Sequence, residues 1–249
     1  MEDVIDLLEA RAAEAPGKLW LAWEPFEGSA REWTRLEFLH DVQRVAGALA
    51  ARGVTVGDRV LVHADNCPEL LLTWFACAWL GAVCVVLNPK SATDELVYFA
   101  HHTGAVGMVT QAGLAAPPSL SSQGLRFVIT IGGGAFQDGG DALLGKPAPR
   151  VQADAASAAC MMFTSGTTSR PKAVVWSRAN ALWAAESGCR GAGLLASDIA
   201  LVFVPLYHVV GLAWSVLPAL QAGATIVLQP RFSASRFWPV AIARQATFA

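Results

Sequence analysis

Hydrophobic and polar positions along this chain follow two patterns, short apolar runs and longer stretches with apolar residues at helical spacing. In 36–52, Phe38, Val42 and Val45 recur at intervals of three or four residues, which predicts a helix with one buried face. The stretch 59–63 is short and rich in valine, as is typical of a buried strand. Because such helices and strands alternate along the chain, the pattern predicts an α/β fold with mostly parallel sheets.

The same patterns give a set of expected elements. Helices are expected at 3–13, 36–52, 67–80, 93–102, 179–192 and 233–244. Strands are expected at 19–23, 32–34, 59–63, 83–87, 106–110, 126–131, 155–162, 199–204 and 225–228, and the short apolar run 173–176 is expected to be a strand or a helix. Thr93 is expected to cap the helix that follows it, and the glycine-rich stretch 132–148 is expected to be a loop.

Two apolar stretches, 70–87 and 209–228, are long enough to cross a bilayer. A Gly-Ala pair interrupts each of them, at Gly81 and Gly223, and β-branched residues follow before a proline stops the run. A helix that ends at glycine and a buried strand after it explain this order better than a membrane span. We therefore expect no membrane-spanning segment.

The second half of the chain repeats the order of features in the first. Trp33-Thr34-Arg35 precedes one amphipathic helix and Trp176-Ser177-Arg178 precedes another, and the two long apolar stretches also correspond. The predicted fold is two similar α/β halves, with residues 1–150 as the first subdomain and 151–249 as the second. Because Thr247-Phe248-Ala249 only begins the last expected strand, we expect an N-terminal fragment whose second subdomain is incomplete.

Composition narrows the classes of protein. The 249 residues are 54% hydrophobic and 15% charged, which excludes a disordered chain. The net charge of -2, without a basic cluster, argues against nucleic acid as a partner. Five cysteines without C-x-x-C spacing indicate buried thiols in a reducing cytoplasm rather than a metal site, and the N-terminus lacks the basic start of a signal peptide.

A polar loop after the apolar run 155–162 carries the strongest candidate chemistry. The stretch Phe163–Lys172 reads F-T-S-G-T-T-S-R-P-K, which combines hydroxyl donors, a glycine that lets the backbone approach a ligand, and a lysine. Such groups suit the oxygens of a polyphosphate. The candidate phosphate ligands are Thr164, Ser165, Gly166, Thr167, Thr168 and Lys172. The alternative is an ordinary Ser/Thr-rich hairpin loop.

This loop resembles the pattern [YF]-T-S-G-T-T-G-x-P-K-G of the adenylate-forming superfamily, which includes acyl-CoA synthetases, luciferases and the adenylation domains of peptide synthetases. Ser169 and Ala173 stand where the pattern has its two later glycines. Within the superfamily, 65–69, 163–172 and 232–238 look most similar to crotonobetaine/carnitine-CoA ligases. The resemblance implies the N-terminal part of the large domain of an acyl-CoA synthetase.

A second stretch, Pro205–Leu212, follows the expected strand 199–204 and resembles the superfamily's P-[LM]-[FY]-H-x-x-G. The resemblance implies that Tyr207, His208 and Gly211 border the acyl pocket, with the His208 imidazole able to bind a carboxylate or adenylate oxygen. A helix-capping or core histidine is the alternative. His63, at the end of an earlier strand, is interpreted as structural, and Asp65 or Asn66 is expected to cap the helix that follows.

The implied reaction has two steps. A small-molecule carboxylate attacks the α-phosphorus of ATP, bound with Mg²⁺, to give acyl-adenylate and pyrophosphate, and the thiolate of CoA then displaces AMP. Lys172 and His208 are the implied catalytic residues.

Three superfamily segments are not found in this sequence: Y-G-x-T-E, T-G-D and a C-terminal lysine. We therefore expect the chain alone to be a poor enzyme. The alternatives are a truncated paralogue that binds nucleotide or acyl ligand without catalysis, a half-enzyme that pairs with a separate C-terminal chain, and an amino-acid-activating domain. A second copy of the chain and a C-terminal chain are the candidate protein partners.

Overall fold

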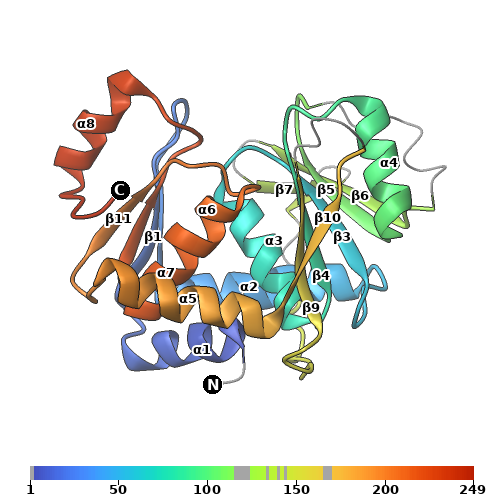
Figure 1. Ribbon diagram of the computed structural model, residues 1–249, viewed down its shortest axis with the longest axis horizontal. Helices are drawn as coiled ribbons and strands as arrows, with labels where there is room; N and C mark the ends of the chain where they lie inside the picture. Colours follow the sequence, from blue (N-terminus) through green and yellow to red (C-terminus); the bar gives the residue numbers. More distant parts are fainter. Residues whose placement is uncertain (1–2, 115–123, 133–134, 139–140, 143–144, 165–169) are drawn as a thin grey trace. The chain divides into compact units, whose positions relative to one another are not determined.

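The computed structural model describes residues 3–114, 124–132, 135–138, 141–142, 145–164 and 170–249 (Figure 1). Contacts between residues divide the chain into two units. Unit 1 contains 1–40, 66–68 and 178–249, and unit 2 contains 41–65 and 69–177. The units are therefore interleaved along the chain, whereas the halves expected from the sequence are continuous stretches.

Unit 2 contains an eight-stranded sheet. Its strands are β3 (Arg59–His63), β4 (Val83–Leu87), β5 (Gly107–Gln111), β6 (Phe127–Gly132), β7 (Ala135–Asp138), β8 (Asp141–Ala142), β9 (Ala158–Phe163) and β10 (Ala173–Ser177). Their order is β10-β9-β4-β3-β5-β6-β7-β8, and the five strands from β9 to β6 pair in parallel. The carboxyl ends of these five strands therefore meet at one edge, where ligands usually bind in such sheets.

Helices α2 (Arg35–Ala50), α3 (Pro68–Trp79) and α4 (Thr93–Thr103) alternate with the first strands along the chain. Every residue of α3 is buried, which explains why its sequence is apolar apart from Glu69 and Thr73. Helix α4 instead packs one face against the sheet, where Leu96 and Phe99 join Leu61 and Met108 in a buried cluster. This packing fixes α4 beside β5.

Unit 1 contains a four-stranded sheet. Its strands are β1 (Leu19–Trp23), β2 (Arg31–Thr34), β11 (Ile199–Val202) and β12 (Thr225–Leu228), in the order β11-β12-β1-β2. The helical segments of this unit are α1 (Val4–Glu14), α5 (Arg178–Ala192), α6 (Val209–Gly211), the π-helical η2 (Leu212–Val216), α7 (Leu217–Ala222) and α8 (Ala234–Ala243). Helices α1, α5 and α7 contact one another, as Figure 1 shows, and α8 packs on the sheet through Phe237 and Val240.

The expected repeat is present in the strand pairing. In unit 2, Val60 of β3 lies between Cys84 of β4 and Gly107 of β5, both in parallel register. In unit 1, Ala200 of β11 pairs in the same way with β12 and with Phe248. The prediction of two similar α/β halves with mostly parallel sheets is thus confirmed.

The two arginines that the repeat places in equivalent positions are both buried. Arg178 begins α5 and donates a hydrogen bond of 2.7 Å to the Asp3 carboxylate, which also caps α1. Arg35 begins α2 and donates to the carbonyl oxygen of Gly223 at 2.6 Å, at the end of α7. Each guanidinium thus joins the start of its helix to another helix terminus of unit 1.

The two long apolar stretches have the expected order of helix, glycine and strand. Gly81 follows α3 and Gly223 follows α7, and both adopt the left-handed conformation, with φ of 73° and 72°. Strands β4 and β12 follow them. Across the part of the chain that the structure describes, no helix combines the length and the hydropathy that a membrane span requires.

Two local expectations were wrong. Ala92, not Thr93, is the N-cap residue of α4, and its N–H donates to the Glu95 carboxylate at 2.9 Å. This is the half of a capping box that Glu95 supplies, and Ala92 has no side chain that could accept from the first helical N–H groups. The stretch 132–148 was expected to be a loop, but its described part contains β7 and β8, because Phe136 is buried and anchors the extra strands to the sheet.

Candidate functional site

The base of the polar loop is a short antiparallel pair formed by β9 and β10. Thr164 donates its backbone N–H to the carbonyl oxygen of Lys172 at 3.0 Å. The N–H of Lys172 donates to the Thr164 hydroxyl oxygen at 3.4 Å. Both side chains are exposed, so Thr164 and Lys172 close the loop and face solvent. The other predicted phosphate ligands, Ser165, Gly166, Thr167 and Thr168, lie outside the described residues.

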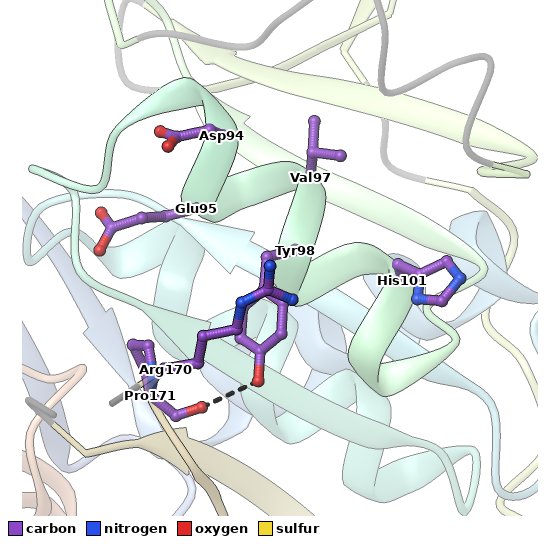
Figure 2. Close-up of a pocket in the computed structure, with 7 residues that line it drawn as sticks. All are labelled: Asp94, Glu95, Val97, Tyr98, His101, Arg170 and Pro171. Atoms are coloured by element: carbon purple, nitrogen blue, oxygen red, sulfur yellow. Dashed lines mark hydrogen bonds between the residues drawn. The ribbon is translucent and has the colours of Figure 1, made fainter. Parts of the chain in front are cut away.

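Helix α4 contacts both ends of this loop. The hydroxyl of Tyr98 donates to the carbonyl oxygen of Pro171 at 3.1 Å, and the Arg170 guanidinium lies 5.2 Å from the centre of the Tyr98 ring (Figure 2). On the other side, the rings of Phe163 and Phe99 are 4.1 Å apart. The loop is therefore anchored to a helix that is itself packed on the sheet.

A hollow of about 490 Å³ lies over these contacts. Figure 2 shows its lining, which is Asp94, Glu95, Val97, Tyr98, His101, Arg170 and Pro171. Arg170 and Pro171 come from the loop and the other residues come from α4. The sequence patterns did not indicate this contact, because the two segments are about 70 residues apart and no motif connects them.

The second predicted group is Tyr207, His208 and Gly211. Tyr207 and His208 lie in the turn that joins β11 to α6, and Gly211 is the last residue of α6. His208 is the N-cap residue of α6, but its side chain makes no capping hydrogen bond and is exposed. The N–H of Gly211 donates to the His208 carbonyl oxygen at 3.0 Å. An exposed imidazole just beyond the carboxyl end of a parallel strand is well placed to contact a ligand.

Gly211 is required by the close packing of this turn. A Cβ atom at this position would lie 2.3 Å from the carbonyl oxygen of Pro205. The π-helical segment η2 begins directly after Gly211, and such segments occur frequently at functional sites. The structural role of this motif glycine is therefore to avoid a clash with the backbone of Pro205.

Asn66 holds this turn in place, a role that the sequence did not reveal. Its side-chain oxygen accepts the N–H of Leu206 at 2.8 Å, and its amide nitrogen donates to the carbonyl oxygens of Val204, at 2.9 Å, and Gln229, at 3.2 Å. The expectation that Asn66 caps the following helix is therefore replaced by a role in positioning the segment before His208. The only sequence signal for this role was an asparagine just before an expected helix, and that signal does not indicate which distant residues it contacts.

His63 is buried and has a partner on each ring nitrogen. Nδ1 lies 3.2 Å from the Thr110 hydroxyl oxygen and Nε2 lies 3.1 Å from the carbonyl oxygen of Pro89. Burial lowers the pKa of His63, opposed by the bond to Pro89 and by the charge of Asp65. A neutral, fully bonded imidazole fits the structural interpretation.

The described residues contain no group of three or more His, Cys, Asp and Glu side chains that could hold a metal ion. The predicted site residues fall into two groups. Thr164 and Lys172 are together in unit 2, and Tyr207, His208 and Gly211 are together in unit 1.

A family model described as AMP-binding enzyme matches residues 8–248, nearly the whole chain. The chain belongs to the AMP-binding enzyme family. Among curated members, a crotonobetaine/carnitine-CoA ligase from Salmonella paratyphi A is 31% identical over 242 residues, which are 92% of this chain and 47% of the relative. A ligase of the same name from Proteus mirabilis is also 31% identical. The chain spans about half the length of the curated relatives that it matches.

Solved structures of CoA ligases and synthetases agree with the fold. An o-succinylbenzoate CoA synthetase from Bacillus subtilis in complex with AMP is 27% identical, with a TM-score of 0.79 over 97% of this chain and 60% of that one. A long-chain-fatty-acid-CoA ligase from Archaeoglobus fulgidus has a TM-score of 0.89 over 98% of this chain and 50% of that one. At 20% identity, the second likeness supports the fold alone. The expectation of an α/β fold of the acyl-CoA synthetase type is confirmed.

Proposed function

We propose that this chain forms the phosphate-binding and acyl-binding part of an AMP-forming acyl-CoA synthetase. The observation that carries the proposal is the loop closed by Thr164 and Lys172, two residues of the motif that lie side by side at the end of β9. Membership of the AMP-binding family and the names of the curated relatives, which are CoA ligases, support it.

In this proposal the polar loop holds the β- and γ-phosphates of ATP. Its ligands are Thr164, Ser165, Gly166, Thr167, Thr168 and Lys172. The Thr164 hydroxyl oxygen accepts the Lys172 N–H, so its own hydrogen remains free to be donated to a phosphate oxygen. The exposed Lys172 ammonium supplies positive charge at the same place.

The chemical demand on these groups is neutralisation of charge. A carboxylate must approach the α-phosphorus of ATP, so two anions meet, and negative charge builds on the departing pyrophosphate as the new bond forms. Fixed donors and a cation beside that pyrophosphate stabilise the transition state more than the ground state. Magnesium is proposed to enter with ATP and to share this neutralisation.

The exposed His208 is proposed to contact the carboxylate or the adenylate oxygen, with Tyr207 and Gly211 bordering the acyl group. The turn before α6 suits this role because Asn66 fixes it from Val204 to Leu206. CoA is the proposed acceptor in the second step, and which acyl group is transferred is set by residues around this turn.

We also propose that the enzyme acts in a reducing compartment such as the cytoplasm. All five cysteines are free thiols. Burial raises the pKa of Cys160 to about 12 and also raises that of Cys84, so these thiols are chemically inert in the folded protein.

The experiment is exchange of labelled pyrophosphate into ATP by the purified chain, with a panel of carboxylates. Since the chain alone is expected to be a poor enzyme, we expect slow exchange that depends on a carboxylate. Lys172→Ala should reduce its rate by about a hundredfold, as does the loss of other groups that stabilise a transition-state charge. Lys146→Ala removes an exposed lysine of the same unit and is the matched control. Equal exchange by the Lys172→Ala variant and the control would refute the assignment.

The second candidate is binding of nucleotide or acyl ligand without turnover, by this chain alone or with a separate chain. Binding of ATP without pyrophosphate exchange would favour this candidate, and exchange by the purified chain would exclude it.

A further inference from the structure

We propose that Tyr98 is a positioning residue that fixes the peptide group between Pro171 and Lys172, and with it the place of the Lys172 ammonium in the phosphate loop. The inference rests on the proposed function in one respect, namely that the loop binds the phosphates of ATP. It assigns a role to a side chain on α4, outside both sequence motifs.

The peptide group between Pro171 and Lys172 is bonded on both sides. Its carbonyl oxygen accepts the Tyr98 hydroxyl at 3.1 Å, and its N–H donates to the Thr164 hydroxyl oxygen at 3.4 Å. The proline ring also restricts φ on the side of Pro171. These constraints orient the peptide plane and therefore the direction in which the Lys172 side chain leaves the backbone.

Tyr98 is held rigidly enough to act as an anchor. Its ring stacks on His102 with centroids 5.1 Å apart and meets the edge of Phe163 at 6.5 Å. The next residue, Phe99, is buried against the sheet. Figure 2 shows the Tyr98 hydroxyl pointing at Pro171 while Arg170 lies over the ring.

As a consequence, the position of α4 determines the position of the Lys172 backbone through the Tyr98 hydroxyl. An exposed lysine has a flexible side chain with many rotamers, so a fixed backbone reduces the entropy that is lost when it binds phosphate. Without the Tyr98 hydroxyl, the Pro171–Lys172 peptide would sample more orientations. The apparent affinity for phosphate would then fall although every phosphate ligand is still present.

The first test measures this positioning without any ligand. Hydrogen–deuterium exchange of the segment 164–173 is compared between the wild-type chain and Tyr98→Phe, which keeps the ring and removes the hydroxyl. We expect exchange in this segment to be about fivefold faster in the variant, as for the loss of one hydrogen bond. Exchange in β3 and β4 should be unchanged.

The matched control is Thr103→Val. Thr103 lies on the same helix and donates its hydroxyl to the Phe99 carbonyl oxygen at 2.7 Å, a hydrogen bond within the helix. If Thr103→Val accelerates exchange in 164–173 as much as Tyr98→Phe does, the effect reflects the stability of α4 and the proposal is overturned. Unchanged exchange in Tyr98→Phe also overturns it.

The second test is the dissociation constant for ATP with magnesium, measured by titration calorimetry on the same variants. We expect Tyr98→Phe to weaken binding about fivefold and Thr103→Val to leave it unchanged. In a Lys172→Ala background, Tyr98→Phe should have a much smaller effect, because the positioned cation is gone.

The two tests separate the inference from the proposed function. If the wild-type chain does not bind ATP, the proposed function fails, and the exchange measurement still decides whether Tyr98 positions the loop. If ATP binds with equal affinity to the wild type and Tyr98→Phe, the inference fails while the proposed function stands.

Discussion

His63 is a single residue whose burial makes stability depend on pH. Its pKa is lowered from the ordinary value of 6.5 mainly by burial, so the folded protein holds it neutral at a pH where the unfolded chain begins to protonate it. The contribution of His63 is therefore fully present above pH 6.5 and is lost as the pH falls below that value. A histidine paired with an acid has a raised pKa, and its contribution to stability is instead lost as the pH rises.

We expect the free energy of unfolding in urea to fall between pH 7.5 and 5.5 in the wild type, and to fall less in His63→Gln. His40→Gln, which changes an exposed histidine of α2, should leave the pH dependence as in the wild type. If His63→Gln and the wild type lose the same stability over this range, the buried neutral imidazole is not the cause.

At the residue scale, the sequence identified groups with their own chemistry and missed those that act through distant partners. Thr164 and Lys172 were predicted as one site because a contiguous motif contains both, and the structure places them as a hydrogen-bonded pair. Asn66 and Tyr98 were not predicted in their present roles, because their partners are 140 and 73 residues away. Nothing local to either residue encodes such a contact.

The turn between β11 and α6 packs so closely against Gly211, the last residue of α6, that no side chain fits there. Because a Cβ atom on Gly211 would lie 2.3 Å from the carbonyl oxygen of Pro205, Gly211→Ala must displace the turn that carries His208. We expect a loss of about 1–3 kcal/mol in the free energy of unfolding, as for other overpacked sites.

Gly191→Ala is the matched control for this change. Gly191 lies near the end of α5, and a Cβ atom there would meet nothing within 4 Å. In a helix, this substitution should raise stability by up to about 1 kcal/mol. Opposite signs for the two variants in chemical unfolding would support the account, and a neutral Gly211→Ala would contradict it.

Helices α1 and α5 are joined by a buried ion pair. Asp3 and Arg178 have side chains that are 6% and 1% exposed, with 2.7 Å between Oδ2 and Nη1. Asp3→Asn keeps a side chain that can cap α1 but removes the carboxylate charge that Arg178 contacts at 2.7 Å. We expect the free energy of unfolding to fall by about 3 kcal/mol, the usual cost of breaking a buried pair from one side.

The pair of Asp41 and Arg44 on α2, 3.7 Å apart with side chains that are 24% and 44% exposed, provides the comparison. Asp41→Asn should change stability far less, since solvent screens both groups. The double variant Asp3→Asn with Arg178→Met should recover part of the loss. A cost for Asp3→Asn no larger than that for Asp41→Asn would show that the buried pair is not important for stability.

Helices and strands with a clear hydrophobic period were predicted from the sequence. Those that depend on pairing or on contacts with other segments were not. Helix α2 and the fully buried α3 with β4 were expected within a few residues of their bounds, because periodicity and the glycine stop are local signals. Strands β7 and β8 were missed because glycines dominate that stretch, and it is extended only through the pairing of β7 with β6 and of β8 with β7. The cap of α4 was misplaced because the N-cap residue, Ala92, has no capping side chain, and the bond from its N–H to Glu95 is the sign of the helix start.

At the scale of the whole molecule, the repeat was the most informative signal. It predicted two similar halves, and the matching registers of Val60 and Ala200 confirm them. The sequence did not predict that the compact units are interleaved, because β9 and β10 follow the first half in sequence but add to its sheet. Which strands join which sheet depends on long-range pairing that a linear pattern does not contain.

The central claim is that the loop closed by Thr164 and Lys172 binds the phosphates of ATP, and the most direct measurement is titration of the 249-residue chain with ATP and magnesium. The account predicts binding by the wild type, binding weakened about tenfold or more in Lys172→Ala, and unchanged binding in Lys146→Ala. Equal affinity in all three proteins, or no binding by the wild type, would contradict it.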